Sequence, residues 1–296
     1  MSREAARQQW MGYGLLAITM LIWGSFTLLS RWGATQSLTP WDIAGLRFAT
    51  AAVVLVPWLL LWRRQWQFLC DRRMLALGVL GGTLYSVLAY LGFAYAPAAH
   101  AAIWLNGMLP FATALAAWGL LGEPFSRDIR LSLLVIALAL GGMMGLMATA
   151  GQFHVGWGDG FFVLASLCWG FYTALLKKWS FPPWQAMCGV AIWSALLYLP
   201  VYVLALPKGL AGATWLQIGV QAVFQGIFVV IVAMLTYIGA IERLGAFKSG
   251  SILALAPLLA ALAAVPLLNE ALTPALLVGL LGVSVGALQP WRFWRG

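Results

Sequence analysis

The chain has 296 residues, of which 63% are hydrophobic and only 8% charged, and it carries a formal net charge of +9. A soluble domain holds roughly 25% charged residues, so this composition excludes a water-soluble globular protein and makes the lipid bilayer the solvent. The connections between the apolar stretches are also too short for a separate soluble domain, catalytic or ligand-binding.

Apolar stretches of membrane-spanning length follow one another along the whole chain. A helix needs about 20 residues to cross the hydrocarbon core. The first stretch has that length and no small-x-small cleavage site follows it, so we interpret it as a retained helix and not as a signal peptide. We therefore predict an all-α membrane protein with ten transmembrane helices, over 11–33, 41–62, 74–95, 99–121, 129–149, 158–178, 184–206, 215–241, 246–268 and 274–290.

The basic residues indicate how these helices are oriented. If the N-terminus is cytoplasmic, 14 of the 17 basic residues fall on the inner side, and only Arg31 and Lys208 fall on the outer side. Lys and Arg are enriched in cytoplasmic loops of membrane proteins. We therefore predict that both termini are cytoplasmic and that the positive charge orients helices. It gives no reason to expect nucleic-acid binding.

The second half of the sequence repeats the pattern of the first at an offset of 146 to 147 residues. Three features are repeated. They are a Trp-Gly pair, a Tyr-x-Gly motif, and a Pro followed by a run rich in small residues that ends at a Glu. They occur as Trp23-Gly24 and Trp169-Gly170, as Tyr90-x-Gly92 and Tyr237-x-Gly239, and as Pro110 to Glu123 and Pro257 to Glu270.

Each repeat holds five predicted helices, over 11–150 and 157–290, and an odd number inverts the second copy relative to the first. Inverted repeats are the usual architecture of secondary transporters, whose substrate site lies near mid-membrane between the repeats. The sequence therefore predicts a secondary transporter that works by alternating access.

These repeats resemble the EamA domains of the drug/metabolite transporter superfamily. The resemblance rests on the early Trp-Gly, the late Pro and the closing Leu-x-Glu of each copy, and on Leu46-Arg47-Phe48 in the second helix. The abundance of Trp and the Asn269-Glu270-Ala271 segment are most similar to bacterial aromatic amino-acid exporters. The second repeat departs from the pattern, because Ser194 stands where the offset would place an Arg.

The resemblance implies a multi-pass protein of the bacterial inner membrane, monomeric or homodimeric. It would export aromatic and other neutral, apolar amino acids such as Phe, Met and Thr. Export of other small metabolites or drugs on the same fold is the alternative, and an intramembrane enzyme is a third possibility that the residues disfavour. No nucleophile–base pair or metal-ligand cluster appears in the spans, so we expect no catalysis, cofactor or metal.

Aromatic and polar residues within the spans are the candidates for a substrate cavity. Trp is unexpected near mid-bilayer, since its N–H usually meets water at the headgroups. Structural hydrogen bonding between helices is the alternative for any single residue. The resemblance implies a central cavity lined by the first, third and fourth helices of each repeat. The predicted substrate-binding residues are Trp23, Thr27, Tyr85, Tyr90, Trp104, Trp169, Thr173, Gln225, Tyr237 and Ser251.

Two prolines and one arginine complete the candidates. Pro110 and Pro257 each remove a backbone hydrogen bond inside a span, so we predict hinges there, with static kinks as the alternative. Arg47 is the only charge deep in a predicted span. We favour its reaching the outer face to pair with Asp42, and the alternative is contact with a substrate carboxylate.

The acidic residues all fall at the ends of the predicted spans. A cavity without a carboxylate suits a neutral or zwitterionic solute with an apolar side chain, bound by stacking and a few hydrogen bonds. It also leaves proton coupling without an obvious carrier. Facilitated export down a gradient is therefore one option, and we predict that acidifying one side of a liposome does not drive uphill uptake.

Overall fold

The computed structural model describes residues 3–34, 37–63, 66–96, 98–151, 155–253, 255–256 and 273–289, and within these ranges all regular structure is helical. The α-helices are α1 (Arg3–Ala34), α2 (Pro40–Trp58), α3 (Arg72–Gly78), α4 (Leu84–Tyr95), α5 (Ala98–Ala101), α6 (Leu109–Leu121), α7 (Arg127–Thr149), α8 (Trp157–Trp179), α9 (Pro183–Ala205), α10 (Trp215–Gln221), α11 (Ala233–Leu244), α12 (Ala246–Leu253) and α14 (Pro274–Leu288).

Several of these helices continue through π-helical segments, in which the backbone bonds reach one residue further than in an α-helix. The π-helical segments are η1 (Leu59–Arg63), η3 (Val79–Thr83), η4 (Ala102–Gly107) and η6 (Ala222–Val232). Two short 3₁₀ turns, η2 (Gln67–Cys70) and η5 (Leu210–Gly212), lie in connections.

Seven described helices are long and apolar enough to cross a membrane: Pro40–Leu61, Arg72–Gly92, Ile103–Leu121, Arg127–Thr149, Trp157–Trp179, Pro183–Ala205 and Trp215–Leu244. The helix α1 has 32 residues, and a shorter apolar helix covers Leu277–Gly286. The second half of the span predicted at 246–268 falls within 257–272, outside the described residues.

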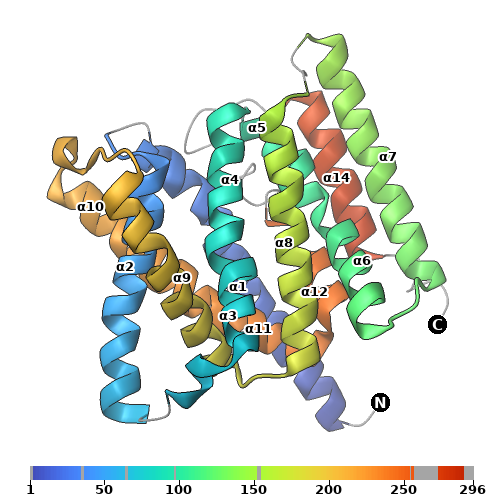
Figure 1. Ribbon diagram of the computed structural model, residues 1–296. Helices are drawn as coiled ribbons and strands as arrows, with labels where there is room; N and C mark the ends of the chain where they lie inside the picture. Colours follow the sequence, from blue (N-terminus) through green and yellow to red (C-terminus); the bar gives the residue numbers. More distant parts are fainter. Residues whose placement is uncertain are drawn as a thin grey trace.

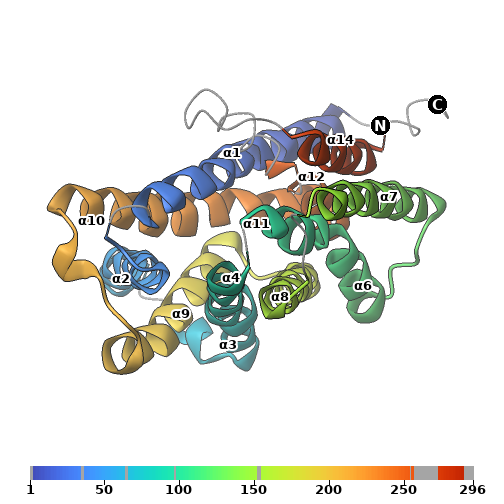
Figure 2. The ribbon, with the colours of Figure 1, turned by 90° about the horizontal axis from the view of Figure 1, so that it is seen from above.

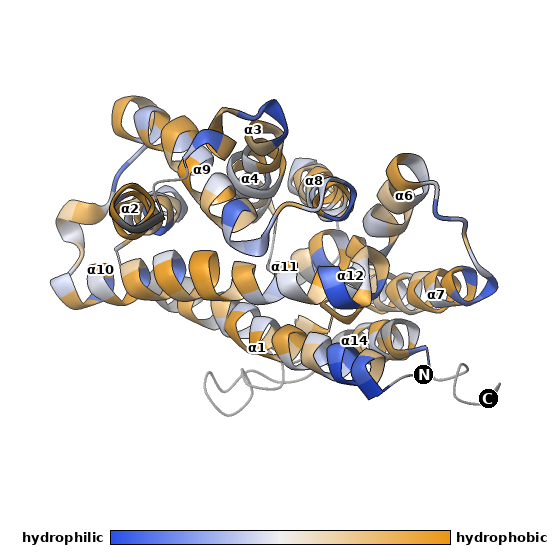
Figure 3. Cartoon of the chain, turned by 90° about the horizontal axis from the view of Figure 1, so that it is seen from below, coloured by the Kyte–Doolittle hydropathy of each residue, from blue (hydrophilic) through white to orange (hydrophobic). Residues whose placement is uncertain are grey.

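The outer surface of the bundle is apolar. Large side chains that would be buried in a soluble protein stand free, including Leu204 at 84% exposure, Leu61 at 74% and Leu138 at 69%. Hydrophilic residues gather toward helix ends, as Figure 3 shows. An apolar surface of this extent would associate in water, whereas lipid covers it. The protein is therefore a multi-pass membrane protein.

The two halves of the chain interleave. The most extensive helix pairings join an element before residue 151 to one after residue 155: α14 with α7, α6 with α8, α1 with α11, α4 with α8, and α2 with both η6 and α9. Figures 1 and 2 show α7 beside α14 and α1 running along α11. The middle of the bundle is therefore built jointly by both halves.

Small residues let α8 approach its neighbours closely. A Cβ atom on Gly170 would lie 2.5 Å from the carbonyl carbon of Ala112 in α6, and one on Gly81 would lie 2.4 Å from the ring of Tyr172. Small residues at such crossings are typical of membrane helix packing. They hold Trp169, which precedes Gly170, close to the centre of the bundle.

Pro110 lies at the start of α6, directly after η4 and the turn at Met108. A Pro in the first helical turn loses no hydrogen bond that the helix would otherwise have made. The interruption of this span therefore comes before Pro110 in the chain, in the π-helical segment and the turn. Pro257 lies outside the described residues.

Candidate functional site

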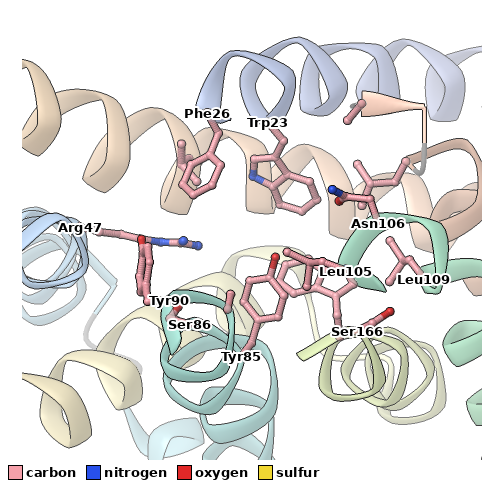
Figure 4. Close-up of a pocket in the computed structure, with 15 residues that line it drawn as sticks. Trp23, Phe26, Arg47, Tyr85, Ser86, Tyr90, Leu105, Asn106, Leu109 and Ser166 are labelled. Carbon is pink, nitrogen blue, oxygen red and sulfur yellow. The ribbon is translucent and has the colours of Figure 1, made fainter. Parts of the chain in front are cut away.

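A cavity that encloses about 940 Å³ of empty space, part of it open to the surroundings, lies between α1, α2, α4, η4, α6, α8, η6 and α12 (Figure 4). Its lining is largely apolar and aromatic, with a small number of polar groups. Cavities lined in this way hold small-molecule ligands. The lining comprises Trp23, Phe26, Arg47, Tyr85, Ser86, Ala89, Tyr90, Leu105, Asn106, Leu109, Ser166, Trp169, Val229, Leu253 and Ala256.

Trp169 is the centre of the aromatic part of this lining. Its ring centroid lies 5.2 Å from that of Trp23, with the planes at 80°, and 4.7 Å from that of Tyr85. Edge-to-face and tilted contacts at these distances stabilise aromatic clusters. The two Trp-Gly motifs found by comparing the sequence with itself thus bring their Trp rings into contact on one wall.

Tyr237 and Thr173 support that wall from behind. Tyr237 contacts the rings of Trp23 and Trp169 at centroid distances of 5.2 and 5.9 Å, and its hydroxyl lies 3.0 Å from the Thr173 hydroxyl. The Thr173 hydroxyl also donates to the Trp169 carbonyl oxygen at 2.8 Å. Neither Tyr237 nor Thr173 belongs to the lining, so both are placed to hold the rings that do.

The polar part of the lining is formed by Arg47, Tyr90 and Ser86. Arg47 is 5% exposed, and Figure 4 shows its side chain extending from α2 beside Tyr90 on α4. The Tyr90 hydroxyl interacts with the Arg47 side chain, whereas Arg47 Nε and the Ser86 hydroxyl are buried and find no hydrogen-bond partner among the described residues. Buried polar groups without partners are costly, so this part of the cavity is suited to a polar ligand group.

The expected ion pair between Arg47 and Asp42 is absent from the described structure. Asp42 instead accepts hydrogen bonds from the Thr39 backbone at 2.7 Å, the Thr39 hydroxyl at 2.8 Å, the Gly209 backbone at 2.8 Å and the Tyr202 hydroxyl at 2.5 Å. These donors saturate the carboxylate at the start of α2. Arg47 therefore turns to the cavity and not to the outer end of its helix.

The π-helical segments decide which polar residues reach the cavity. In η4 the lining residues are Leu105 and Asn106, whereas Trp104, which was predicted to bind substrate, packs against neighbouring apolar clusters around Ile103 and Leu105. In η6 the buried Gln225 donates to Gln221 at 3.2 Å and lies outside the lining. A π-helix widens the turn, so α-helical spacing misplaces the faces of these two segments.

The remaining predicted residues divide into two groups. Trp23, Tyr85, Tyr90 and Trp169 lie together at the cavity. The side chains of Thr27 and Ser251 lie outside the described part of the chain. The sequence prediction omitted Ser86 and Asn106, and helical spacing from Tyr90 would have identified Ser86, four residues before it on the same face.

A buried polar contact also joins α5 to α8. His100 Nδ1 in α5 lies 2.8 Å from the Asp159 carboxylate in the first turn of α8, and both side chains are buried. Asp159 also accepts from the Gly156 backbone at 2.8 Å, so it caps α8 while it contacts the other half of the chain.

These observations define a polytopic helical membrane protein with an aromatic cavity between interleaved halves. The EamA-like transporter family matches residues 10–146 and, a second time, residues 156–289. The chain therefore belongs to the EamA-like transporter family, whose members are membrane transporters of small molecules.

Solved structures share this fold. One of the 27 chains that match, described as "Crystal structure of protein", superposes with a TM-score of 0.73 at 20% sequence identity over 98% of each chain. At that identity the likeness concerns the fold alone. No curated protein matches this sequence.

Proposed function

We propose that this EamA-family transporter exports aromatic and other neutral, apolar amino acids, such as Phe, Met and Thr, across the bacterial inner membrane. The observation that carries the proposal is the cavity itself, whose lining combines the rings of Trp23, Tyr85 and Trp169 with the side chain of Arg47. Stacking on those rings suits an apolar side chain, and the polar part of the lining suits the backbone groups of an amino acid.

We propose further that the chain forms ten transmembrane helices in two inverted repeats, 11–150 and 157–290, with both termini cytoplasmic. The interleaved pairing of the halves supports alternating access, because relative rocking of two such halves moves every wall of the cavity. In this mechanism the break before Pro110 and the matched Pro257 act as hinges. Trp104, Thr173, Gln225 and Tyr237 shape the cavity from outside its lining.

The cavity lining within the described residues holds no Asp or Glu. An embedded carboxylate is the usual partner of lipophilic cations and of transported protons in membrane proteins. Its absence from the lining supports facilitated export down the substrate gradient. Acidifying one side of a vesicle should therefore fail to drive uphill uptake of Phe. Robust proton-driven accumulation would contradict this mechanism.

The direct test is transport by the purified full-length chain in proteoliposomes. Vesicles preloaded with radiolabelled Phe, Met or Thr should release them faster than protein-free vesicles, whereas a labelled lipophilic cation such as tetraphenylphosphonium should leave both kinds of vesicle at the same rate. Movement of the cation alone would reject the amino-acid proposal in favour of drug export on the same fold.

A matched pair of tryptophans on α8 links the transport to the cavity. Trp169 is 5% exposed in the lining, and Trp157 is 86% exposed at the start of the same helix. We expect Trp169→Ala to lower the Phe efflux rate by roughly threefold to tenfold, since an aromatic pair contributes about 0.5–1.5 kcal/mol beyond its buried area. Trp157→Ala should leave that rate unchanged.

A further inference from the structure

We propose that Arg47 is the substrate's carboxylate-binding residue, and that the cavity recognises a monocarboxylate with an apolar or aromatic tail without requiring its α-amino group. This inference rests on the proposed transport function and names what the cavity selects: aryl and branched-chain carboxylic acids should enter as readily as the corresponding amino acids.

The first observation is where the charge of Arg47 lies. It is the eighth residue of α2, about 10 Å along the helix axis from its first residue, and it is 5% exposed. A charge at this depth is expensive and in membrane proteins marks a binding or transport site. Its guanidinium carbon lies 5.6 Å from the centroid of the Phe48 ring, a contact that weakly stabilises the cation without neutralising it.

The second observation is that acids close enough to serve as counter-ions are committed elsewhere. Asp42 on the same helix is saturated by Thr39, Tyr202 and Gly209, as described above. The lining itself contributes no acid within the described residues. A bound anion would therefore supply the negative charge that Arg47 lacks.

The third observation concerns the polar side chains next to Arg47. The hydroxyls of Tyr90 and Ser86 line the same part of the cavity; the Tyr90 hydroxyl interacts with the Arg47 side chain, and the Ser86 hydroxyl is buried without a hydrogen-bond partner among the described residues. A carboxylate accepts several hydrogen bonds and pairs with a guanidinium through two parallel N–H···O contacts. One carboxylate can thus satisfy Arg47 and the two hydroxyls together.

The lining offers fewer groups that can bind an ammonium group than groups that can bind a carboxylate. Its acceptors are neutral, namely the Asn106 amide oxygen and hydroxyl oxygens, and the positive charge of Arg47 opposes a second cation in the same low-dielectric space. Figure 4 shows Trp23 and Tyr85 to one side of Arg47, and Trp169 packs against both rings, so the three rings provide stacking surface for the tail. The chemistry that fits is a carboxylate at one end and an apolar group at the other.

Four phenyl compounds separate these requirements in the wild-type protein. Phenylalanine has both charged groups, 3-phenylpropanoate only the carboxylate, and phenethylamine and phenylalaninamide only the amine. As competitors of radiolabelled Phe efflux, 3-phenylpropanoate should match phenylalanine within about threefold, and the two amines should be at least about tenfold weaker, as expected for loss of a charge-assisted hydrogen-bonded pair. Equal competition by phenethylamine and 3-phenylpropanoate would overturn the inference while leaving amino-acid transport intact.

Variants of Arg47 provide the second arm. Arg47→Gln should weaken Phe and 3-phenylpropanoate by at least about tenfold and bring phenethylamine to parity with them, whereas Arg47→Lys should retain part of the carboxylate preference. The matched control is Arg130→Gln, an exposed arginine in the first turn of α7, which should behave as wild type. An Arg47→Gln protein with the wild-type competition series would overturn the inference.

Direct binding of radiolabelled 3-phenylpropanoate to the detergent-solubilised full chain keeps the two proposals distinguishable. If no amino acid is transported but 3-phenylpropanoate binds to the wild type and not to Arg47→Gln, the transport proposal fails and the carboxylate site stands. If Phe is transported but 3-phenylpropanoate does not bind to the wild type, the carboxylate site fails alone. Should Arg47→Gln not fold, the competition series on the wild type and Arg47→Lys decides.

Discussion

Asp42 and Arg47 are buried charges on the same helix, five residues apart, with opposite surroundings. The Asp42 carboxylate receives four hydrogen bonds and joins the start of α2 to Tyr202 in α9 and to the loop at Gly209. The Arg47 side chain lines the cavity, and its Nε finds no partner among the described residues. The difference separates a charge that stabilises the fold from one that is available to a ligand.

The largest expected effect tests the structural side of this comparison. Asp42→Ala should lower the free energy of unfolding by about 3–5 kcal/mol, because it leaves several buried hydrogen-bond donors without an acceptor. Thermal unfolding in detergent, followed by a thiol-reactive or intrinsic fluorescence signal, measures the loss. The control is Glu4→Ala, an exposed acid on α1, and equal unfolding temperatures for the two variants would contradict the assignment.

A smaller effect is expected from removing one donor of Asp42. Tyr202→Phe deletes the hydroxyl that donates to Oδ1 at 2.5 Å and leaves the other three bonds in place. The expected loss is about 1.5–3 kcal/mol, the usual contribution of a hydrogen bond to a charged group. Tyr95→Phe, at a tyrosine that is 66% exposed, is the matched control and should have no measurable effect.

A partly exposed acid, Asp71, sharpens the comparison by reducing burial. Asp71 caps α3 through the Arg73 backbone at 2.8 Å, and the Arg73 side chain hydrogen-bonds to it. Asp71→Ala should cost about 1 kcal/mol, the usual loss of an N-cap, with little added by a solvent-exposed ion pair. A loss comparable to that of Asp42→Ala would show that burial is not what separates the two acids.

The same acid makes a prediction about pH. The hydrogen bond from Arg73 holds the pKa of Asp71 below its ordinary range. A depressed folded-state pKa stabilises the protein above the unfolded pKa of about 3.9, and the stabilisation is lost as the pH falls further. The difference in unfolding temperature between wild type and Asp71→Ala should therefore be constant from about pH 5 to 8 and shrink below about pH 4.

The smallest expected effect on stability belongs to Arg47. Arg47→Gln should change the free energy of unfolding by less than about 1 kcal/mol or raise it, since it removes a charge that the fold has not paired. The unfolding temperature, measured beside Asp42→Ala, checks this expectation. A loss as large as that of Asp42→Ala would give Arg47 a structural role and erase the difference between the two residues.

Part of the candidate site could be predicted from the sequence because it lies on regular α-helix. Trp23 and Trp169 belong to a repeated motif, and both belong to the lining with Tyr85 and Tyr90. In the π-helical segments η4 and η6 the predicted residues Trp104 and Gln225 lie outside the lining. No local sequence pattern distinguishes such segments from α-helix.

The partners of Asp42 show a second limit. Thr39 is close in sequence and completes a capping box that spacing alone suggests, whereas Tyr202 and Gly209 lie 160 and 167 residues away along the chain. A single sequence shows that Asp42 lies near Arg47 on one helix but does not show which distant donors reach it first. Because those distant donors occupy the Asp42 carboxylate, Arg47 turns to the cavity.

The interleaving of the halves also bears on how the protein is made. Trp23, Arg47, Tyr85 and Asn106 precede residue 151, whereas Trp169 and Val229 follow it. A nascent chain that has inserted only its first half therefore holds the guanidinium and part of the aromatic wall, with the opposite wall still to be synthesised. The cavity is completed only when the second half has been synthesised, and a ribosome that stalls before α8 leaves a fragment that lacks Trp169 and Val229.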